Sequence, residues 1–223
     1  MAEGRPDRML WDSLWMELCE IKNTCNGREA FSILERGLNA LKIERCYCSC
    51  VAGSGTCFYP TAEVHNLLGN PSDIEIGNNS HIRGELITGR TGGEIKIGSH
   101  CYIGEHTRIW CLESITLGSY VTISYGVSII DTDGHELDPQ QRLNSQWTGP
   151  VLRCRDSLTH SDNIKVSPIL FGNNILVFPN STILKGVTVG SGALIGTGSI
   201  VTHDVPANSL VMGNPAKVIR TFH

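Results

Sequence analysis

The sequence has little of what marks several large classes of protein. Aromatic residues make up 6% of its 223 residues, and its 18 Lys and Arg residues are outnumbered by 22 Asp and Glu. The basic residues form no cluster, which argues against nucleic-acid binding because that activity usually requires a basic patch. No apolar run approaches the roughly 18 residues of a membrane span, and the N-terminus lacks the apolar stretch of a signal peptide. We therefore expect a cytoplasmic protein that neither inserts into membranes nor binds nucleic acid.

Cysteine is plentiful, with nine residues, but the Cys-x-x-Cys spacing of zinc sites is missing. Cys46, Cys48 and Cys50 alternate as the residues of a strand do. Cysteine is among the residue types most often buried as free thiols, and disulfides are rare in reducing compartments. The pattern therefore predicts buried free thiols rather than a metal site or disulfides.

Glycine is abundant, with 24 residues, and part of it belongs to a repeat of six residues. Large apolar residues stand at every sixth position: Phe171, Val177, Ile183, Val189, Ile195 and Val201. A second, usually smaller residue follows four places after each: Ile175, Ser181, Val187, Ala193, Ser199 and Val205. A helix needs apolar spacing near 3.6, so a period of six indicates short strands with a turn in each hexad. Three hexads make one triangular coil, and stacked coils form a parallel β-helix.

The repeat also divides the chain. Weaker hexads reach back to Ile76, and we count about five coils between residues 72 and 206, interrupted by one long loop at 134–167. Residues 1–45 carry apolar residues at helical spacing and predict a helical appendage that caps the open end of the solenoid. The two stripes are Leu10, Leu14, Leu18 and Ile21, then Phe31, Leu34, Leu38 and Leu41. Residues 46–71 are expected to form an irregular lead-in, and residues 207–223 a C-terminal tail.

Three motifs in the last coils and the tail resemble a known family. They are Ile183-Leu184-Lys185-Gly186-Val187-Thr188-Val189-Gly190, Gly196-Thr197-Gly198-Ser199-Ile200-Val201-Thr202, and Gly213-Asn214-Pro215-Ala216-Lys217-Val218-Ile219-Arg220. Over residues 72–220 the chain resembles the hexapeptide-repeat acyltransferases, and most closely the branch of maltose and galactoside acetyltransferases and of O-acetyltransferases in capsule and O-antigen synthesis. The resemblance implies a left-handed β-helix, acetyl-CoA as co-substrate, and a homotrimer with sites between subunits.

A candidate catalytic base lies where the regular repeat ends before the long loop. His135 follows Asp131-Thr132-Asp133-Gly134, and histidine suits proton removal near neutral pH. In the resembling enzymes the histidine of this loop is the general base. Asp131 and Asp133 are candidates to orient it. The alternative reading is that Asp-Thr-Asp-Gly forms an ordinary turn and His135 is a solvated loop residue.

The resemblance also implies donor and acceptor sites. The positions that match the family's coenzyme A groove are Ala193, Gly196, Thr202, Lys217 and Arg220. Lys217 and Arg220 suit phosphate groups, although they could be ordinary charged residues of a tail. The family often has lysine where this chain has His203.

On the acceptor side, Arg142 and Trp147 of the long loop are candidate contacts for a sugar, and Trp147 could equally anchor the loop. His100 and His106 stand six residues apart and would face different walls of a coil, so we expect no metal site.

The resulting hypothesis is an acetyl-CoA-dependent O-acetyltransferase that acts on a hydroxyl of a sugar or polysaccharide. N-acetylation of an amino sugar or a small xenobiotic is an alternative within the same chemistry. A non-catalytic structural solenoid is an alternative of another class, and a measurement of coenzyme A affinity separates it from the other two.

Overall fold

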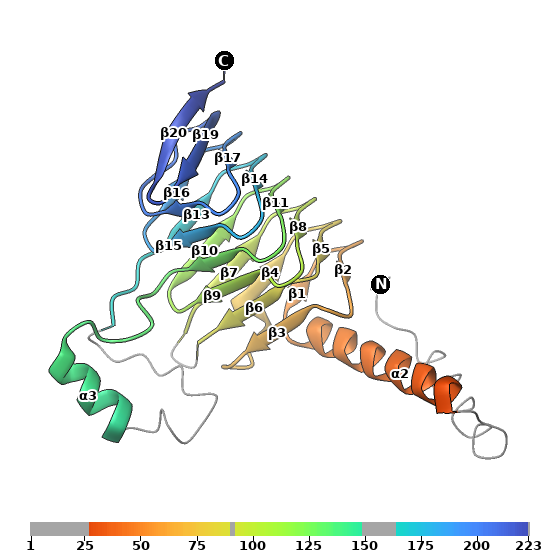
Figure 1. Cartoon of the computed structure of the whole chain (residues 1–223). Helices are drawn as coiled ribbons and strands as arrows, with labels where there is room; N and C mark the ends of the chain where they lie inside the picture. The colour runs from red at the N-terminus through yellow and green to blue at the C-terminus, as the bar shows by residue number, and fades with distance from the viewer. Residues whose placement is uncertain (1–26, 90–91, 149–163, 223) are drawn as a thin grey trace.

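The computed structural model describes residues 27–89, 92–148 and 164–222 and shows a parallel β-solenoid of about six turns (Figure 1). Each turn contributes one short strand to each of three sheets. The turns stack from helix α2 (Gly27–Cys48) at one end to a C-terminal hairpin at the other. The predicted all-β solenoid, with an N-terminal helix and a loop that leaves one coil, is confirmed. The architecture is consistent with a left-handed β-helix.

Successive turns supply the strands in threes. They are β1 (Val51–Ala52), β2 (Cys57–Phe58) and β3 (Glu63–Asn66); β4 (Ile74–Ile76), β5 (His81–Ile82) and β6 (Glu85–Thr88); β7 (Glu94–Ile97), β8 (Tyr102–Ile103) and β9 (Arg108–Cys111); β10 (Ser114–Leu117), β11 (Thr122–Ile123) and β12 (Ser128–Ile130); β13 (Ile169–Phe171), β14 (Leu176–Val177) and β15 (Thr182–Leu184); β16 (Thr188–Val189), β17 (Leu194–Ile195) and β18 (Ile200–Val201). We call the three walls sheet A (β1-β4-β7-β10-β13-β16), sheet B (β2-β5-β8-β11-β14-β17-β19-β20) and sheet C (β3-β6-β9-β12-β15-β18).

Both slots of the hexad point into the solenoid. Ile129 and Ile183 pair in register on sheet C and are fully buried, as the large slot predicts. The smaller slot is buried as well, including Ala193 and the hydroxyl-bearing Ser181. Ser181 Oγ donates to the carbonyl of Gly196 at 2.9 Å, so this buried hydroxyl is satisfied.

Glycine after the large residue is required by close stacking of the coils. A Cβ on Gly98 would lie 2.6 Å from the backbone of Gly118, and a Cβ on Gly118 would lie 2.4 Å from the carbonyl oxygen of Gly172. Any side chain at these positions would push neighbouring coils apart. The repeat therefore selects glycine at this corner for lack of space.

The solenoid begins earlier than the expected residue 72. Strands β1, β2 and β3 pair with β4, β5 and β6, so residues 51–66 form a complete coil rather than an irregular lead-in. Its inward residues Ala52, Phe58 and Val64 do keep the six-residue spacing. The first of them is small, and of the three only Ala52 is followed by a stacking glycine, Gly53, so the sequence signal is weak here.

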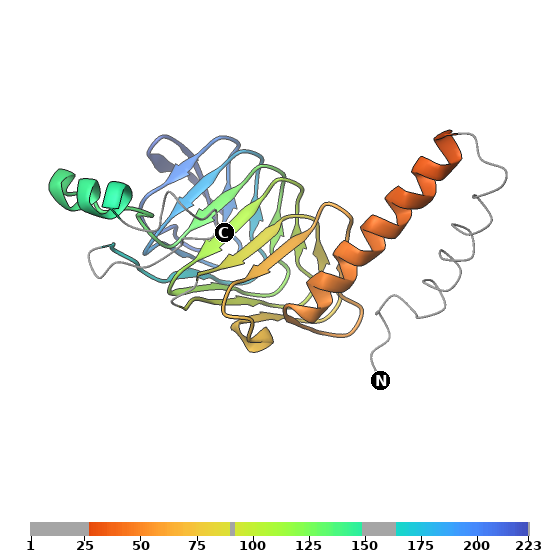
Figure 2. The same cartoon turned by 90° about the horizontal axis from the view of Figure 1, so that it is seen from below.

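Helix α2 covers the start of the solenoid with its C-terminal end only, and the rest of it projects away (Figure 2). Cys46 in the last turn and Cys50 just beyond the helix pack into the core, and Tyr47 packs edge-on against Phe58. Cys46 and Cys48 lie in this helix, so the strand predicted for them is wrong. Both are free thiols, but only Cys46 is buried as expected, and Cys48 is exposed. Burial raises the pKa of Cys46 to about 11.

The apolar stripe predicted for the second helical segment faces outward. Phe31 is 68% exposed, and Leu34, Leu38 and Leu41 are also exposed, whereas Ile33 and Ala40 on another face are buried. The first stripe, Leu10 to Ile21, lies outside the described residues. Among the described residues, no helix is both long and apolar enough to cross a bilayer.

The expected C-terminal tail is a regular hairpin. Strand β19 (Ser209–Gly213) extends sheet B beside β17, and β20 (Ala216–Thr221) pairs with it in antiparallel fashion. The turn contains the cis peptide bond Asn214-Pro215. Simple alternation would place Lys217 and Arg220 on opposite faces of β20. A register shift opposite Leu210 and Val211 pairs Lys217 with Met212 and Arg220 with Leu210, so both basic residues share the outer face.

Candidate functional site

The long loop leaves the solenoid at the corner between sheets C and A, and its two ends are held together. Thr132 forms an antiparallel bridge with Val166. The Asp133 N–H donates to the carbonyl of Lys165 at 3.0 Å, and the Ser167 N–H donates to the carbonyl of Asp131 at 2.9 Å. The stem therefore gives the residues just before His135 a defined position on the fourth coil.

Asp131 is fully buried below this stem, and its carboxylate serves the backbone. Oδ1 accepts the N–H of Leu112 and Oδ2 accepts the N–H of Glu113, each at 2.8 Å. The Cys111 thiol also lies 3.3 Å from Oδ2. Burial first, and then the Asp131 charge, raise the pKa of Cys111. Asp131 thus holds the turn after β9, and the thiol beside it is a poor nucleophile.

Asp133 occupies a different environment at the same corner. Its Oδ1 accepts a hydrogen bond from Lys185 Nζ, and the two groups form an ion pair. Its Oδ2 is buried and has no hydrogen-bond partner. A buried carboxylate oxygen without a donor is costly, so this atom is a candidate acceptor for a group that arrives from the loop or from a ligand.

His135 stands exposed just beyond this carboxylate. Gly134 turns the chain with a φ of +73°, and its N–H donates to Thr132 Oγ1 at 3.0 Å. A Cβ added at Gly134 would meet only the ring of Trp110, at 3.9 Å. Within the described residues His135 has no hydrogen-bond partner, so the structure brings Asp133 and His135 to one corner without joining them.

The loop also contains helix α3 (Pro139–Thr148), which the sequence analysis missed. The signal was present, because Asp138 accepts the N–H of Gln141 at 2.9 Å and Pro139 begins the helix. Arg142, which the sequence predicts to contact the sugar substrate, donates from Nη1 to the carbonyls of Glu136 and Leu137. Its side chain therefore supports the loop next to His135. Trp147 lies in α3, but its side chain is outside the described residues.

The residues predicted to bind coenzyme A are distributed over the last coil and the hairpin. Gly196 lies under Met212, where a Cβ would be 2.3 Å from Met212 Cγ, and Lys217 pairs with Met212 on the neighbouring strand. Arg220 is exposed on the same face, with its guanidinium 5.3 Å from the centre of the Phe222 ring. Gly196, Lys217 and Arg220 therefore lie on the same outer face of sheet B.

Ala193 and Thr202 lie apart from these three. The side chain of Ala193 points into the core, and its N–H already donates to the carbonyl of Gly190 at 3.3 Å. Thr202 follows β18 at the corner between sheets C and A, two coils above the point where the loop leaves, and its Oγ1 lies 2.8 Å from His203 Nδ1. Of the residues predicted to bind coenzyme A, Thr202 is thus the one that lies on the same corner as the His135 loop.

Lys185 is the residue of this corner that the sequence analysis did not weigh. Ile130 and Leu184 pair in register, so the residues that follow them, Asp131 and Lys185, stand on neighbouring coils. Matching the hexads on both sides of the loop would have placed Lys185 beside the Asp-x-Asp segment.

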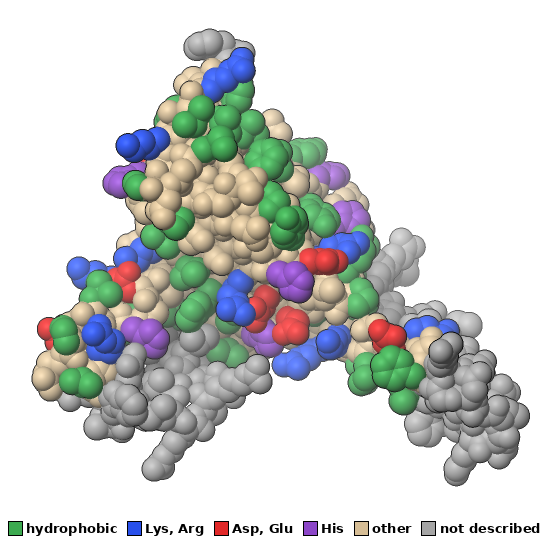
Figure 3. Space-filling model, in the orientation of Figure 1, with side chains coloured by type: hydrophobic (Ala, Val, Ile, Leu, Met, Phe, Trp, Pro, Cys, Tyr) green, Lys and Arg blue, Asp and Glu red, His purple; other side chains and the backbone are tan. Residues whose placement is uncertain are grey.

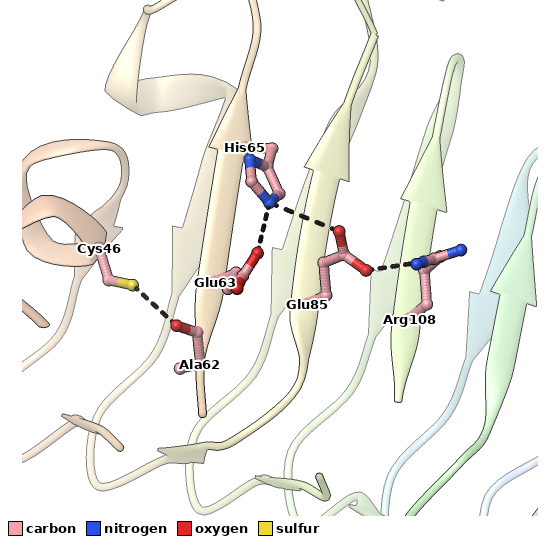
Figure 4. Close-up of polar contacts among 6 residues, drawn as sticks. All are labelled: Cys46, Ala62, Glu63, His65, Glu85 and Arg108. Atoms are coloured by element: carbon pink, nitrogen blue, oxygen red, sulfur yellow. Dashed lines mark hydrogen bonds and ion pairs between the residues drawn. The ribbon is translucent and has the colours of Figure 1, made fainter. Parts of the chain in front are cut away.

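A second polar cluster lies on the outer face of sheet C over the first three coils (Figure 4). Glu63, Glu85 and Arg108 stand in one row across β3, β6 and β9. His65 Nε2 lies 2.9 Å from Glu63 Oε2 and 3.4 Å from Glu85 Oε1, and Arg108 Nε donates to Glu85 Oε2 at 2.7 Å. Figure 3 shows charged side chains gathered over the first coils, whereas apolar and other uncharged surface dominates above them.

The cluster borders a polar hollow of about 510 Å³ that His106 and Ser128 also line. Glu63, His65 and Glu85 present ligand atoms within 4.8 Å of one another, which is compact enough for a metal ion. Each of these atoms already pairs with a neighbour, and the adjacent guanidinium of Arg108 opposes a cation. The geometry is that of a closed ion network.

Comparison with known proteins adds chemistry to this geometry. No protein-family model matches the chain. It is 32% identical to the galactoside O-acetyltransferase of Escherichia coli over 132 residues, which is 59% of this chain and 56% of that enzyme. The chain thus spans little more than half the length of that relative.

Two solved structures share the fold. One is the N-acyltransferase AntD of Bacillus cereus in complex with dTDP and 3-hydroxybutyryl-CoA, with a TM-score of 0.61 and 19% identity over 81% of this chain and 87% of that one. The other is the hexapeptide-repeat acetyltransferase VCA0836 of Vibrio cholerae in complex with acetyl coenzyme A, with a TM-score of 0.51 and 19% identity over 96% of this chain and 88% of that one. The fold and the relatives confirm the resemblance that the motifs indicate, and this chain is a β-solenoid protein related to the hexapeptide-repeat acyltransferases.

Proposed function

We propose that the chain transfers an acetyl group from acetyl-CoA to a hydroxyl group of a sugar or polysaccharide, with His135 as general base. One observation carries the proposal: the exposed His135 follows a stem that fixes the Asp133 carboxylate, with a free buried oxygen, at a corner of the solenoid. The galactoside O-acetyltransferase supports the acceptor class, and the coenzyme A complexes of AntD and VCA0836 support the donor.

The proposed reaction needs no acyl-enzyme. His135 removes the proton of the acceptor hydroxyl as its oxygen attacks the thioester carbon, and a backbone N–H stabilises the oxyanion. The C–S bond then breaks, and the coenzyme A thiolate takes the proton from His135. Among the cysteines at the corner, Cys111 is unsuited to a covalent route because its thiol is buried beside a carboxylate.

The donor would lie along the C-terminal coils. Lys217 and Arg220 share one exposed face of β20 and would meet the phosphates of coenzyme A. Thr202 would meet the part of the donor that approaches the corner of His135. Ala193 would contribute at most a second hydrogen bond to its carbonyl oxygen, because its side chain is buried, its N–H donates to Gly190 and its carbonyl already accepts the N–H of Leu176.

We also propose that the working form is a cytoplasmic homotrimer of about 73 kDa, three copies of the 24.3 kDa chain. Cyclic symmetry closes a heterologous contact between flat walls, and the groove between two walls would hold the donor. Light scattering should show this mass, whereas a stable and active monomer would contradict the trimer.

The test is an acetylation screen. The chain is incubated with acetyl-CoA and a panel of nucleotide sugars, oligosaccharides and amino sugars, and thiol release is followed. Products are then treated with alkali, which cleaves an O-acetyl ester but spares an N-acetyl amide. An ester on a sugar, absent with His135→Ala, supports the proposal; an amide supports the N-acetyl alternative that AntD represents. Failure to bind coenzyme A would favour a structural solenoid.

A further inference from the structure

Two of the described side chains at the loop corner bury polar atoms that nothing satisfies. Besides Asp133 Oδ2, the indole Nε1 of Trp110 is buried without a partner. The ring of Trp110 lies beside Gly134, and Asp133 precedes that glycine, so both residues flank the turn that leads to His135. Native structures leave few such groups, and those that remain call for a physical explanation.

The ion pair explains why only one oxygen of Asp133 is unsatisfied. Lys185 Nζ approaches from the next coil and holds Oδ1, while the Asp133 N–H and the Thr132 bridge hold the backbone. The side chains of Lys185 and Asp133 are 28% and 17% exposed, so the pair is partly shielded from water. The carboxylate therefore cannot rotate freely, and Oδ2 keeps one orientation.

We propose that Lys185 is a positioning residue for the proposed base: by binding Oδ1 of Asp133 it presents Oδ2 as the acceptor for a ring N–H of His135. That hydrogen bond would fix one tautomer of the imidazole and leave its other nitrogen free to take the acceptor proton. Asp131 cannot perform this task, because both its oxygens bind backbone N–H groups. The inference rests on the proposed function, but the hydrogen bond between Asp133 and His135 can be tested without measuring acetyl transfer.

The first test is the tautomer of His135. Ring nitrogen resonances of ¹⁵N-histidine-labelled chain are recorded at about pH 9, where imidazoles are neutral, and His135→Gln assigns the signal. We expect a single tautomer in the unmodified chain, an averaged pair in Lys185→Met, and the single tautomer again in Lys185→Arg. Lys96→Met is the matched control, since Lys96 forms an ion pair with Glu94 on sheet A.

The second test is kinetic. Lys185→Met should lower kcat about tenfold with KM for acetyl-CoA within about twofold, and Lys185→Arg should restore most of the rate. The double variant Asp133→Asn with Lys185→Met should lose no more than about twofold beyond Asp133→Asn alone, because Lys185 acts through Asp133. If Lys185→Met does not fold, Lys185→Gln takes its place.

A single tautomer that persists in Lys185→Met would overturn the proposal, as would additive losses in the double variant. Averaged signals in the unmodified chain would overturn it too. An inactive chain that still shows the Lys185-dependent tautomer would refute the proposed function alone, so the two failures are distinguishable.

Discussion

Two places in the molecule hold a histidine close to carboxylates, and they differ in how completely the polar atoms are satisfied. Over the first three coils, His65 lies between Glu63 and Glu85, and Arg108 pairs with Glu85. At the corner of the fourth coil, Asp133 has one paired and one free oxygen, and His135 has no partner among the described residues.

This difference in hydrogen bonding indicates which cluster stabilises the fold and which could bind a ligand. A closed network gains its stability from its own members and offers nothing to a ligand. An unsatisfied buried carboxylate lowers stability until a donor reaches it, which is the usual condition of a site that acts on something else. The same residue types therefore predict chemistry in one place and packing in the other.

The largest contrast is expected from the two histidines. His135→Ala should lower turnover at least about 10²-fold, because general-base catalysis contributes that much, while coenzyme A binding by calorimetry stays within about twofold. The matched change His65→Ala should leave turnover within about threefold. Equal losses from both would show that the closed network is part of the machinery.

The two aspartates should divide in the same way. Asp131→Asn should lower the free energy of unfolding by about 3 kcal/mol, because a carboxylate that serves two backbone N–H groups is replaced by an amide that cannot satisfy both. In a thermal melt this corresponds to about 6–12 °C. Asp133→Asn should cost less than about 1 kcal/mol and instead lower kcat. An unstable Asp133 variant with normal kcat would reverse the assignment.

A smaller effect is expected at the donor end. Arg220→Ala should raise KM for acetyl-CoA about ten- to a hundredfold and spare kcat, because a charge-assisted bond to phosphate is worth roughly 1.5–3 kcal/mol and lies far from the reacting carbon. The loss should shrink with dephospho-coenzyme A if the 3′-phosphate is the partner. A change in kcat alone would leave Arg220 as an ordinary residue of β20.

The smallest effect should come from the closed network. Glu85→Gln removes the charge that both His65 and Arg108 meet, yet these groups are partly exposed and screened. The loss of unfolding free energy should stay below about 1 kcal/mol and decline further as salt is raised. A loss several times larger, insensitive to salt, would mean that the cluster is more than a surface network.

The sequence predicted burial and close packing correctly at positions where the same contact recurs in every coil. The inward residues such as Ile183 and the glycines at close stacking points were predictable, because each coil repeats the same contacts. It failed where the repeat is absent or weakened, as with Ala52 in the first coil. It also misjudged α2, since an apolar stripe at helical spacing does not reveal which helix face meets the solenoid.

Part of the site was also predictable. His135 and the two nearby aspartates were identified from their position before the loop, although their roles remain predictions. The sequence did not distinguish Asp131 from Asp133, because the partners of each lie about 20 and 52 residues away on other coils. The placement of Lys217 and Arg220 on one face depends on a register shift that alternation along a strand does not reveal.

The sequence by itself determined the solenoid, its three walls and the coil at which the chain leaves it, because the six-residue period repeats one local packing rule. Only the tertiary structure decided which polar groups are satisfied. That depends on which coil stacks on which, and stacking brings Lys185 to Asp133 and leaves one buried carboxylate oxygen without a donor two residues before His135.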